Sequence, residues 1–391
     1  MLNFKSPKIA VAGCACVDIL PRFQNAPSLS ISDIFRPGSF TESDSIIIST
    51  GGSVSNTGIC LSRFGCNVSF ITRIGNDELG TTLLRKLGEH GDTSNIHKSI
   101  GSTSCTIVLA PRGADRFFIR SGGVIDKFSI KDISSKVLSE VDLLHLGYPT
   151  MMPSLYNKDG MELHRIMEAA HKANTATSLD LSVPDNNSEN KKINWNKIWS
   201  NTLPEVDFML PSIEEALATT FPNRYNNLCK EHSNSYDFLD LISPDLFREV
   251  GNQLIKLGAA IVMLKAGKRG IYLRTSTAER ISRIPNIPCD PVNWANLELW
   301  GSSYGLQEVV STTGAGDAAI AAFLTAALNK YSAEDALNSA NAAGCLSLSS
   351  EDATSSIEDW ESVVNITENF LSNPRPDLSW PQLTPSISKI C

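Results

Sequence analysis

The chain has 391 residues, of which 42% are hydrophobic and 19% are charged, and its formal net charge is −8. This composition predicts a globular protein with a sizeable core. The negative charge argues against nucleic acid or an anionic membrane surface as a partner, and no apolar run reaches the roughly eighteen residues that a membrane span needs. The nine cysteines and six histidines lack metal-ligand spacing. The odd cysteine count favours a reducing, cytoplasmic location.

The first predicted element is a buried strand over residues 8–16, KIAVAGCAC. Its apolar stretch is brief and runs directly into Asp18, so we expect a strand here and not a signal peptide. An aspartate at the end of a buried strand is usually solvated or caps a neighbouring group. It can also bind hydroxyl groups, because open α/β sheets place ligands at the carboxyl ends of their strands.

A glycine pair, Gly51 and Gly52, precedes a helical segment that ends at Gly65. Asn56 falls in the first turn of that helix and faces the same end as the glycines. The simpler interpretation is a tight turn with a capping network. The alternative is a polyol-binding site made of glycine N–H groups and a side-chain amide.

Two strands, at residues 103–110 and 116–120, are separated by the turn sequence PRGAD, which predicts a hairpin. With the polar, β-like residues 21–50, they are expected to form a small antiparallel sheet that covers a cleft. We therefore predict a discontinuous β lid from about residues 18–50 and 100–125.

Strand-like and helix-like segments alternate over residues 141–264, which indicates βα units. Right-handed crossovers then predict an α/β fold with a doubly wound, mostly parallel sheet and helices on both faces. We expect one domain over residues 1–373, with insertions at 221–245 and 286–308. The second insertion, with its two tryptophans, is expected to lie over the surface. The Pro- and Ser-rich residues 374–391 are expected to be a tail or a strap.

Two motifs in the second half of the chain allow both a structural and a functional interpretation. Ser212 followed by Glu215 matches a capping box at a helix start, which explains both residues without a ligand. Gly267 and Gly270 follow a buried strand that ends at Lys265. They suit either a close approach of the backbone to a ligand or a plain turn.

Residues 309–328, VVSTTGAGDAAIAAFLTAAL, form a predicted strand, a glycine turn and an alanine-rich helix. A dinucleotide fingerprint is disfavoured, because a second helix follows where a strand with an acid is required, and Asp317 would face the pyrophosphate. Tight packing of small residues does not explain the clustering of Thr312, Thr313 and Asp317. A third interpretation is a phosphoryl-transfer site, because the free N–H groups at a helix N-terminus suit a phosphate.

Residues 51–80 open with Gly-Gly, continue with Asn56 and close with G-x-D-x-x-G, and residues 312–317 read TTGAGD. In this order, the two stretches resemble the ribokinase-like, or PfkB, family of carbohydrate kinases. The resemblance spans roughly residues 8–360, and a P-loop pattern is absent. It implies the α/β fold with a β lid that is predicted above. It also implies transfer of the γ-phosphoryl group of ATP, with Mg²⁺, to a sugar hydroxyl.

The resemblance assigns roles to residues by their positions in these motifs. Asp317 would be the base that accepts the hydroxyl proton. The charge on the transferred phosphoryl group would be held by the backbone N–H groups of Gly314, Ala315 and Gly316. The expected acceptor-binding residues are Asp18, Gly51, Gly52 and Asn56. The expected nucleotide-binding residues are Thr312, Gly267, Gly270 and Asn341.

Some positions depart from the family pattern. Ser311 stands where the family commonly has an aspartate of a monovalent cation site, which argues against activation by K⁺. Ser212 stands where the family's N-x-x-E motif has asparagine, so Glu215 alone would reach the magnesium, through water. The base and the anion hole are unchanged.

An unphosphorylated sugar is the expected acceptor, because no cluster of Lys and Arg accompanies Asp18 or Asn56. A nucleoside kinase of the same family is the first alternative, and a sugar-binding protein without catalysis is the second. The resemblance also suggests a homodimer formed through the lid.

Side chains of the lid region bear on the choice of acceptor. The aromatic residues Phe117, Phe118 and Phe128 could stack on a nucleobase. Arg120 and Asp126 could instead bind hydroxyl groups or a carboxylate. The sequence leaves these alternatives open.

Overall fold

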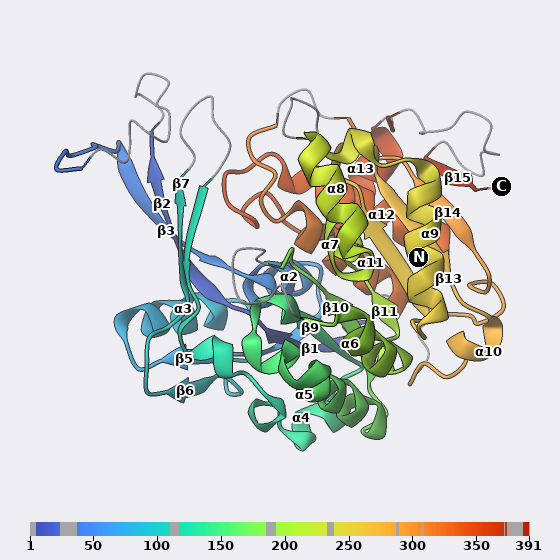
Figure 1. Ribbon diagram of the computed structural model, residues 1–391, viewed down its shortest axis with the longest axis horizontal. Helices are drawn as coiled ribbons and strands as arrows, with labels where there is room; N and C mark the ends of the chain where they lie inside the picture. The colour runs from blue at the N-terminus through green and yellow to red at the C-terminus, as the bar shows by residue number, and fades with distance from the viewer. Residues whose placement is uncertain are drawn as a thin grey trace.

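The computed structural model describes most of the chain. The described residues are 5–23, 37–109, 117–184, 193–232, 238–286, 289–305, 309–370, 372–373 and 386–390. Figure 1 shows a large α/β body from which a small sheet projects on one side.

The body is built on a nine-stranded sheet in the order β15-β14-β13-β12-β11-β10-β9-β1-β4. The pairings from β4 to β12 are parallel, and β13, β14 and β15 are added antiparallel at one edge. The strands are β1 (Lys8–Gly13), β4 (Asn67–Ile71), β9 (Leu143–Gly147), β10 (Ala176–Asp180), β11 (Phe208–Met209), β12 (Ile261–Lys265), β13 (Ile271–Thr275), β14 (Glu298–Gly301) and β15 (Ile387–Lys389). The prediction of a mostly parallel sheet is confirmed.

Helices cover both faces of this sheet (Figure 1), which explains why strands such as β1 and β12 are nearly continuous apolar runs. Ile9 and Val11 of β1 enter one hydrophobic cluster, and Ala10 and Ala12 enter the other. One face carries α2 (Ser53–Arg63), α3 (Glu78–Gly88), α10 (Ala278–Ile281), α11 (Ala315–Leu328), α12 (Ala333–Ser347) and α13 (Trp360–Asn369). The other carries α4 (Ser135–Glu140), α5 (Pro153–Lys172), α6 (Trp195–Thr202), α7 (Ile213–Thr220), α8 (Pro222–His232) and α9 (Pro244–Lys256).

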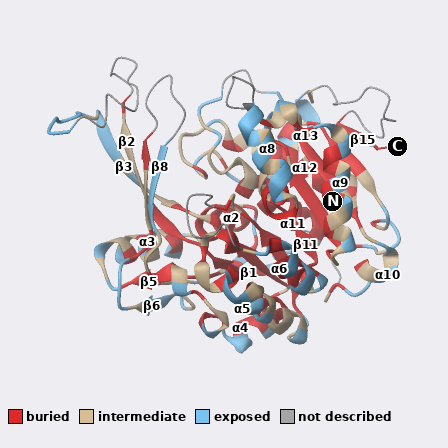
Figure 2. Ribbon diagram, viewed as in Figure 1, coloured by how far each residue is buried: buried red, intermediate tan, exposed pale blue. Residues whose placement is uncertain are grey.

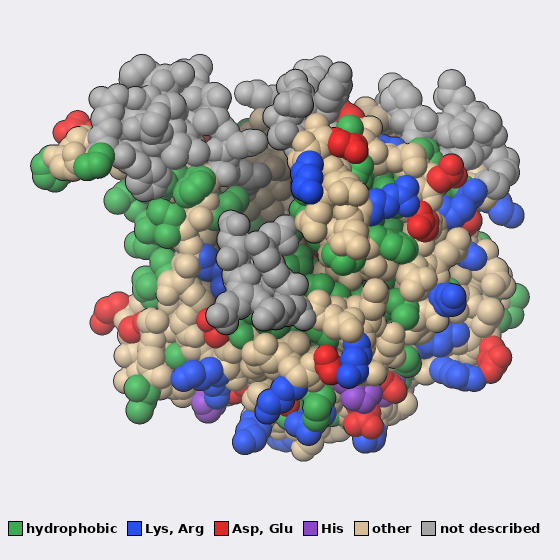
Figure 3. Space-filling view, viewed as in Figure 1, with side chains coloured by type: hydrophobic (Ala, Val, Ile, Leu, Met, Phe, Trp, Pro, Cys, Tyr) green, Lys and Arg blue, Asp and Glu red, His purple; other side chains and the backbone are tan. Residues whose placement is uncertain are grey.

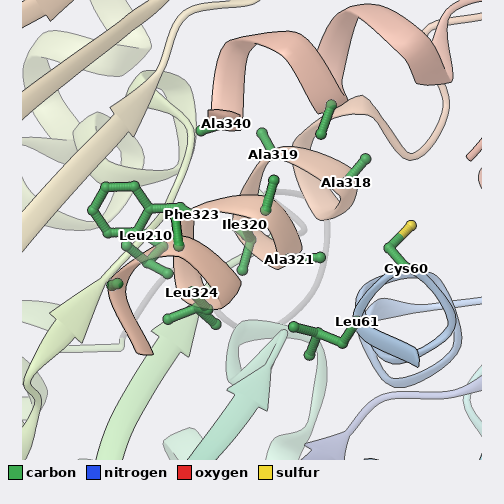
Figure 4. Packing of buried hydrophobic residues seen from close by; sticks show 14 of the residues in the cluster. Cys60, Leu61, Leu210, Ala318, Ala319, Ile320, Ala321, Phe323, Leu324 and Ala340 are labelled. Atoms are coloured by element: carbon green, nitrogen blue, oxygen red, sulfur yellow. The ribbon is translucent and has the colours of Figure 1, made fainter. Parts of the chain in front are cut away.

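Helix α11 is apolar on nearly all sides because it is enclosed by neighbours. Figure 4 shows its residues Ala318 and Ala321 on the side of Cys60 and Leu61, which belong to α2. Small side chains on α11 let the two helices approach closely. The packing thus brings the starts of α2 and α11, more than half the chain apart in sequence, to one end of the sheet.

The projecting sheet is the predicted lid, in the order β3-β2-β7-β8. Its strands are β2 (Cys16–Arg22), β3 (Ser45–Gly51), β7 (Cys105–Leu109) and β8 (Phe117–Ser121). The β7–β8 pairing is antiparallel as expected, although its connecting turn lies outside the described residues. The expectation of a wholly antiparallel lid is wrong, because β2 and β7 pair in parallel. After β3 the chain returns to the body, and it re-enters the lid as β7, which runs in the same direction as β2.

The chain also contains a two-stranded sheet formed by β5 (Arg73–Gly75) and β6 (His97–Ser99).

Two peripheral segments differ from the predictions. The insertion 286–308 does not simply lie over the surface, because Trp294 and Trp300 are buried and Trp300 belongs to β14. Figure 2 shows that buried residues concentrate in the sheet of the body and the helix faces against it. The segment 374–391 is not only a tail, since its residues Ile387–Lys389 form β15 and pair with β14. Burial of apolar area and of the hydrogen-bonding edge of β14 stabilises both arrangements.

Candidate active site

The N-terminus of α11 is shaped by Gly314. This residue has φ of 81°, a left-handed conformation that favours glycine, and a β-carbon there would lie 2.6 Å from the carbonyl oxygen of Ala353. The turn therefore packs directly against the loop that follows α12. It leaves the first N–H groups of α11 pointing outward at the positive end of the helix, where an anion is stabilised.

Asp317 lies in the first turn of α11, is only 5% exposed and accepts three side-chain hydrogen bonds. Nδ2 of Asn56 donates to Oδ2 at 3.1 Å, and Oγ1 of Thr57 donates to Oδ1 at 2.8 Å. The hydroxyl of Tyr148, which follows β9 with φ of 59°, donates to Oδ2 at 3.0 Å. Burial and the nearby charge of Asp317 raise the pKa of Tyr148, so the tyrosine stays a donor. These contacts hold the carboxylate in one position.

Asn56 thus has a role that the sequence did not indicate. It was expected to bind the acceptor, and in the structure its amide nitrogen orients Asp317. Its Oδ1 atom is buried and has no hydrogen-bond partner among the described residues. A buried amide oxygen without a partner is costly, so this oxygen remains suited to a ligand hydroxyl.

The predicted acceptor residues Asp18, Gly51 and Gly52 lie together at the base of the lid. A β-carbon at Gly51 would collide with the carboxylate of Asp18, and one at Gly52, where φ is 81°, would lie 2.6 Å from the carbonyl oxygen of Cys14. The Cys16 thiol donates to Oδ1 of Asp18 at 3.2 Å. Burial raises the pKa of Asp18 to about 6. The glycines therefore let the backbone pass next to a desolvated carboxyl group.

Beneath the turn lies Lys265, which ends β12 and is largely shielded from solvent. Nζ of Lys265 is 2.7 Å from Oδ1 of Asp180, which ends β10. A β-carbon at Gly316 would lie 3.5 Å from Nζ, so the ammonium group is directly under the start of α11. Burial alone would lower the pKa of Lys265, but the carboxylates of Asp180 and Glu215 outweigh it and raise that pKa. The start of α11 therefore has a positively charged group below it.

Glu215 belongs to the capping box that the sequence predicted. The backbone N–H of Ser212 donates to its Oε2 atom at 2.6 Å, and the Ser212 hydroxyl accepts from the Glu215 N–H. Burial raises the pKa of Glu215, and the charge of Lys265 opposes that effect. Glu215 thus caps α7 and also faces the charged cluster, so its two interpretations are compatible.

The predicted nucleotide residues are less concentrated. Gly270, with φ of 106°, is required by packing, because a β-carbon would collide with the Gly301 carbonyl oxygen. Asn341 lies against the same Gly301 and donates to the carbonyl oxygen of Leu337 at 3.2 Å. Gly267 lies in the turn after β12, and Thr312 is exposed. The turn interpretation therefore explains Gly270 without a ligand.

The loop behind Gly314 is held by an arginine from α2. The guanidinium group of Arg63 donates to the carbonyl oxygens of Thr354 and Ile357. The carboxylate of Asp352 accepts the N–H groups of Thr354 and Ser355 at 3.1 and 2.7 Å. At the start of the TTGAGD turn, Oγ of Ser311 accepts the N–H of Thr313. Protein groups therefore hold both the loop after α12 and the start of the TTGAGD turn in place.

Sequence reasoning missed several residues of the site and misplaced one. Tyr148 and Thr57 gave no readable signal, because their role depends on contacts between distant segments. Asp180 and Lys265 did have a readable signal, since each is a charged residue at the carboxyl end of a buried parallel strand. Phe128 cannot stack on a base, because it is fully buried in the core.

Within the described ranges, no group of three or more His, Cys, Asp and Glu side chains could hold a metal ion by itself. No helix of the described residues is long and apolar enough to span a bilayer. A magnesium ion in such a site keeps waters and takes ligands from substrate phosphates. The carboxylate of Glu215, which interacts electrostatically with Lys265 and Asp317, fits that kind of coordination through water.

The fold and the site together define a ribokinase-like α/β kinase. A family model described as pfkB family carbohydrate kinase matches residues 12–293 and 305–360, and the chain belongs to that family of phosphotransferases. Ribokinase from Arabidopsis thaliana, solved with ribose and ATP, superposes with a TM-score of 0.67 at 20% identity, covering 93% of this chain and 99% of that one.

Two relatives show the range of names among similar sequences. The chain is 23% identical over 361 residues to a 5-dehydro-2-deoxygluconokinase of Clostridium perfringens, covering 90% of this chain and 92% of the relative. It is 23% identical over 310 residues to a 2-dehydro-3-deoxygluconokinase of Bacillus subtilis, covering 75% and 79%.

Proposed function

We propose that the protein transfers the γ-phosphoryl group of ATP to a hydroxyl group of a small sugar, with Asp317 as the catalytic base. The observation that carries the proposal is the position of Asp317 in the first turn of α11, beside the N–H groups of residues 314–316. Membership of the carbohydrate kinase family and relatives named as sugar kinases support it.

The reaction assigns each group a step. One carboxylate oxygen of Asp317 accepts the proton of the acceptor hydroxyl while the hydroxyl oxygen bonds to the γ-phosphorus of ATP. The bond between the γ-phosphorus and the β–γ bridging oxygen breaks, and ADP leaves. The N–H groups of Gly314, Ala315 and Gly316 stabilise the charge on the transferred group. The hydrogen bonds from Asn56 and Tyr148 keep the base aligned, which is a positioning effect.

Lys265 supports the same step from below. Its ammonium group adds a fixed positive charge under Gly316, where the transferred phosphoryl group would lie. Mg²⁺, when bound with ATP, would supply further neutralisation of phosphate charge, and Glu215 would hold one of its waters. Thr312, Gly267 and Asn341 are proposed to border the nucleotide. The carbonyl contacts of Arg63 support a reaction that does not depend on K⁺.

The test is an assay of ADP release with Mg²⁺-ATP and a panel of pentoses, hexoses, sugar acids and nucleosides. Replacing Asp317 with Asn should lower kcat by about 10²–10⁴-fold and leave acceptor binding measurable by calorimetry. Glu361→Gln, an exposed acid on α13, is the matched control and should not change kcat. If the wild type releases no ADP with any acceptor, the kinase proposal fails and a sugar-binding protein remains. A nucleoside as the best acceptor would favour the nucleoside kinase instead.

The protein is further proposed to form a homodimer through the outer face of the lid. Ile46, Ile48, Phe117 and Ile119 are between 42% and 62% exposed there, and hydrophobic side chains gather along the lid in Figure 3. An exposed apolar patch of this kind favours an interface. Light scattering should show a dimer that Ile48→Asp converts to a monomer, and a wild-type monomer would contradict the proposal. The free, mostly buried cysteines of the described residues support a cytoplasmic location.

A further inference from the structure

A row of polar side chains crosses the inner face of the lid. Asp18 of β2 pairs in register with Ser49 of β3 and with Thr106 of β7, and Thr106 pairs with Arg120 of β8. Paired residues of neighbouring strands project from the same face of a sheet. Ser49, Asp18, Thr106 and Arg120 therefore form one continuous row.

The row faces the active site. The Asp18 carboxylate lies against Gly51, next to the glycine pair that precedes α2. Nη2 of Arg120 donates to the carbonyl oxygen of Met151 in the body at 3.4 Å. Burial raises the pKa of the Cys14 thiol to about 11, and the charge of Arg120 opposes that rise, which places the guanidinium group near the end of β1. The opposite face of the lid carries Ile48 and Ile119 instead.

The two ends of the row offer different chemistry. The carboxylate of Asp18 and the hydroxyl of Thr106 suit sugar hydroxyl groups. Arg120 is the single cation of the row. Adjacent strands lie about 4.8 Å apart, so Asp18 and Arg120 are separated by two steps, or roughly 10 Å of sheet. That span suits an extended chain of about six carbons. One end of such a chain would meet hydroxyl ligands and the other a guanidinium group.

Arg120 retains capacity for an anionic ligand. It forms an ion pair with Asp126, in which Nη2 and Oδ1 are 3.6 Å apart, and this Oδ1 atom has no hydrogen-bond partner among the described residues. Its bond to Met151 is long at 3.4 Å. The planar fork of a guanidinium group matches a carboxylate with two parallel hydrogen bonds. The single positive charge of Arg120 balances one carboxylate but only half the charge of a phosphate dianion.

This inference rests on the proposed kinase function. We propose that the acceptor is a sugar acid, whose carboxylate pairs with Arg120 while its hydroxyl groups bind Asp18 and Thr106. Arg120 then selects acidic over neutral sugars. The reacting hydroxyl lies at the Asp317 end of the site.

The experiment compares four acceptors. Two are sugar acids, namely D-gluconate and a six-carbon 2-keto-3-deoxy acid, and the other two are D-fructose and D-fructose 6-phosphate. Wild type, Arg120→Gln and Arg120→Lys are assayed for kcat and KM, and acceptor binding is measured by calorimetry without ATP. Lys127→Gln, which removes an exposed cation near the lid, is the matched control. Melting temperatures show that each variant is folded.

A sugar acid should have the highest kcat/KM. Arg120→Gln should raise its KM by about 10- to 100-fold with little change in kcat, and Arg120→Lys should be intermediate. The KM for fructose should not change. A neutral sugar as the best acceptor, with a KM indifferent to Arg120→Gln, would overturn the proposal, and so would a preference for the sugar phosphate. If no sugar is phosphorylated, the kinase function fails, and loss of sugar-acid binding in Arg120→Gln still decides the role of Arg120.

Discussion

Nζ of Lys265 lies 2.7 Å from Oδ1 of Asp180, and these two residues end the parallel strands β12 and β10 on either side of the short β11. Asp180 is buried, the side chain of Lys265 is 11% exposed, and the ammonium group lies under Gly316. The same lysine can therefore neutralise the acids of the body and the phosphoryl group above the turn.

Replacing Lys265 with Met should affect both stability and activity. It leaves Asp180 buried without its partner, so the free energy of unfolding should fall by about 3–5 kcal/mol. Loss of the charge at the turn should lower kcat by about 10- to 100-fold. The double variant Lys265→Met/Asp180→Asn, measured by denaturant unfolding and ADP release, should regain most of the stability and none of the activity. Recovery of kcat in the double variant would mean that Lys265 only neutralises Asp180.

The glycines of the turn should differ in their tolerance of alanine. At Gly314 an alanine would adopt a left-handed conformation and meet the backbone of Ala353, so Gly314→Ala should destabilise the protein by at least about 1 kcal/mol. At Gly316 the β-carbon makes ordinary contacts with Lys265 within a helix, so Gly316→Ala should be neutral or stabilise by up to about 1 kcal/mol. Thermal unfolding of both variants tests the difference. Equal losses would contradict the geometry of the turn.

Asp18 should make stability depend on pH. Its pKa is raised from 3.8 to about 6 by burial, so the folded state binds the proton more tightly than the unfolded state. The resulting stabilisation is complete below about pH 4 and is lost as the pH rises through about 6. Asp18→Asn should therefore be more stable than wild type by roughly 2–3 kcal/mol at pH 8 and no more stable at pH 4. Urea unfolding at both pH values measures this, and a pH-independent difference would contradict it.

Arg63 should make the activity independent of K⁺. Its guanidinium group already satisfies carbonyl oxygens of the loop that packs on Gly314. Wild-type kcat should be the same in K⁺ and in tetramethylammonium chloride. Arg63→Met should lower kcat, and added guanidinium should restore part of it, whereas the exposed control Arg85→Met should behave as wild type. A several-fold activation of the wild type by K⁺ would disprove the expectation.

Local patterns predicted the fold because the relevant physics is local. Buried parallel strands such as β1 and β12 are mostly apolar runs, and the capping box of Ser212 and Glu215 involves residues three apart. Local patterns could not predict the parallel pairing of β2 with β7 or the pairing of β15 with β14. Both depend on edges that exist only once the sheets have formed.

The sequence by itself determined the α/β class, the lid segments and the glycine turn with Asp317 at a helix start, because strand and helix periodicity, turn residues and capping preferences act over a few neighbours. The tertiary structure alone decided what surrounds that carboxylate. Asn56, Thr57 and Tyr148 reach Asp317 from segments more than 160 residues away, and Lys265 reaches the turn from another strand. Packing of α2 against α11 and the common end of the parallel strands create these contacts, and no local pattern encodes them.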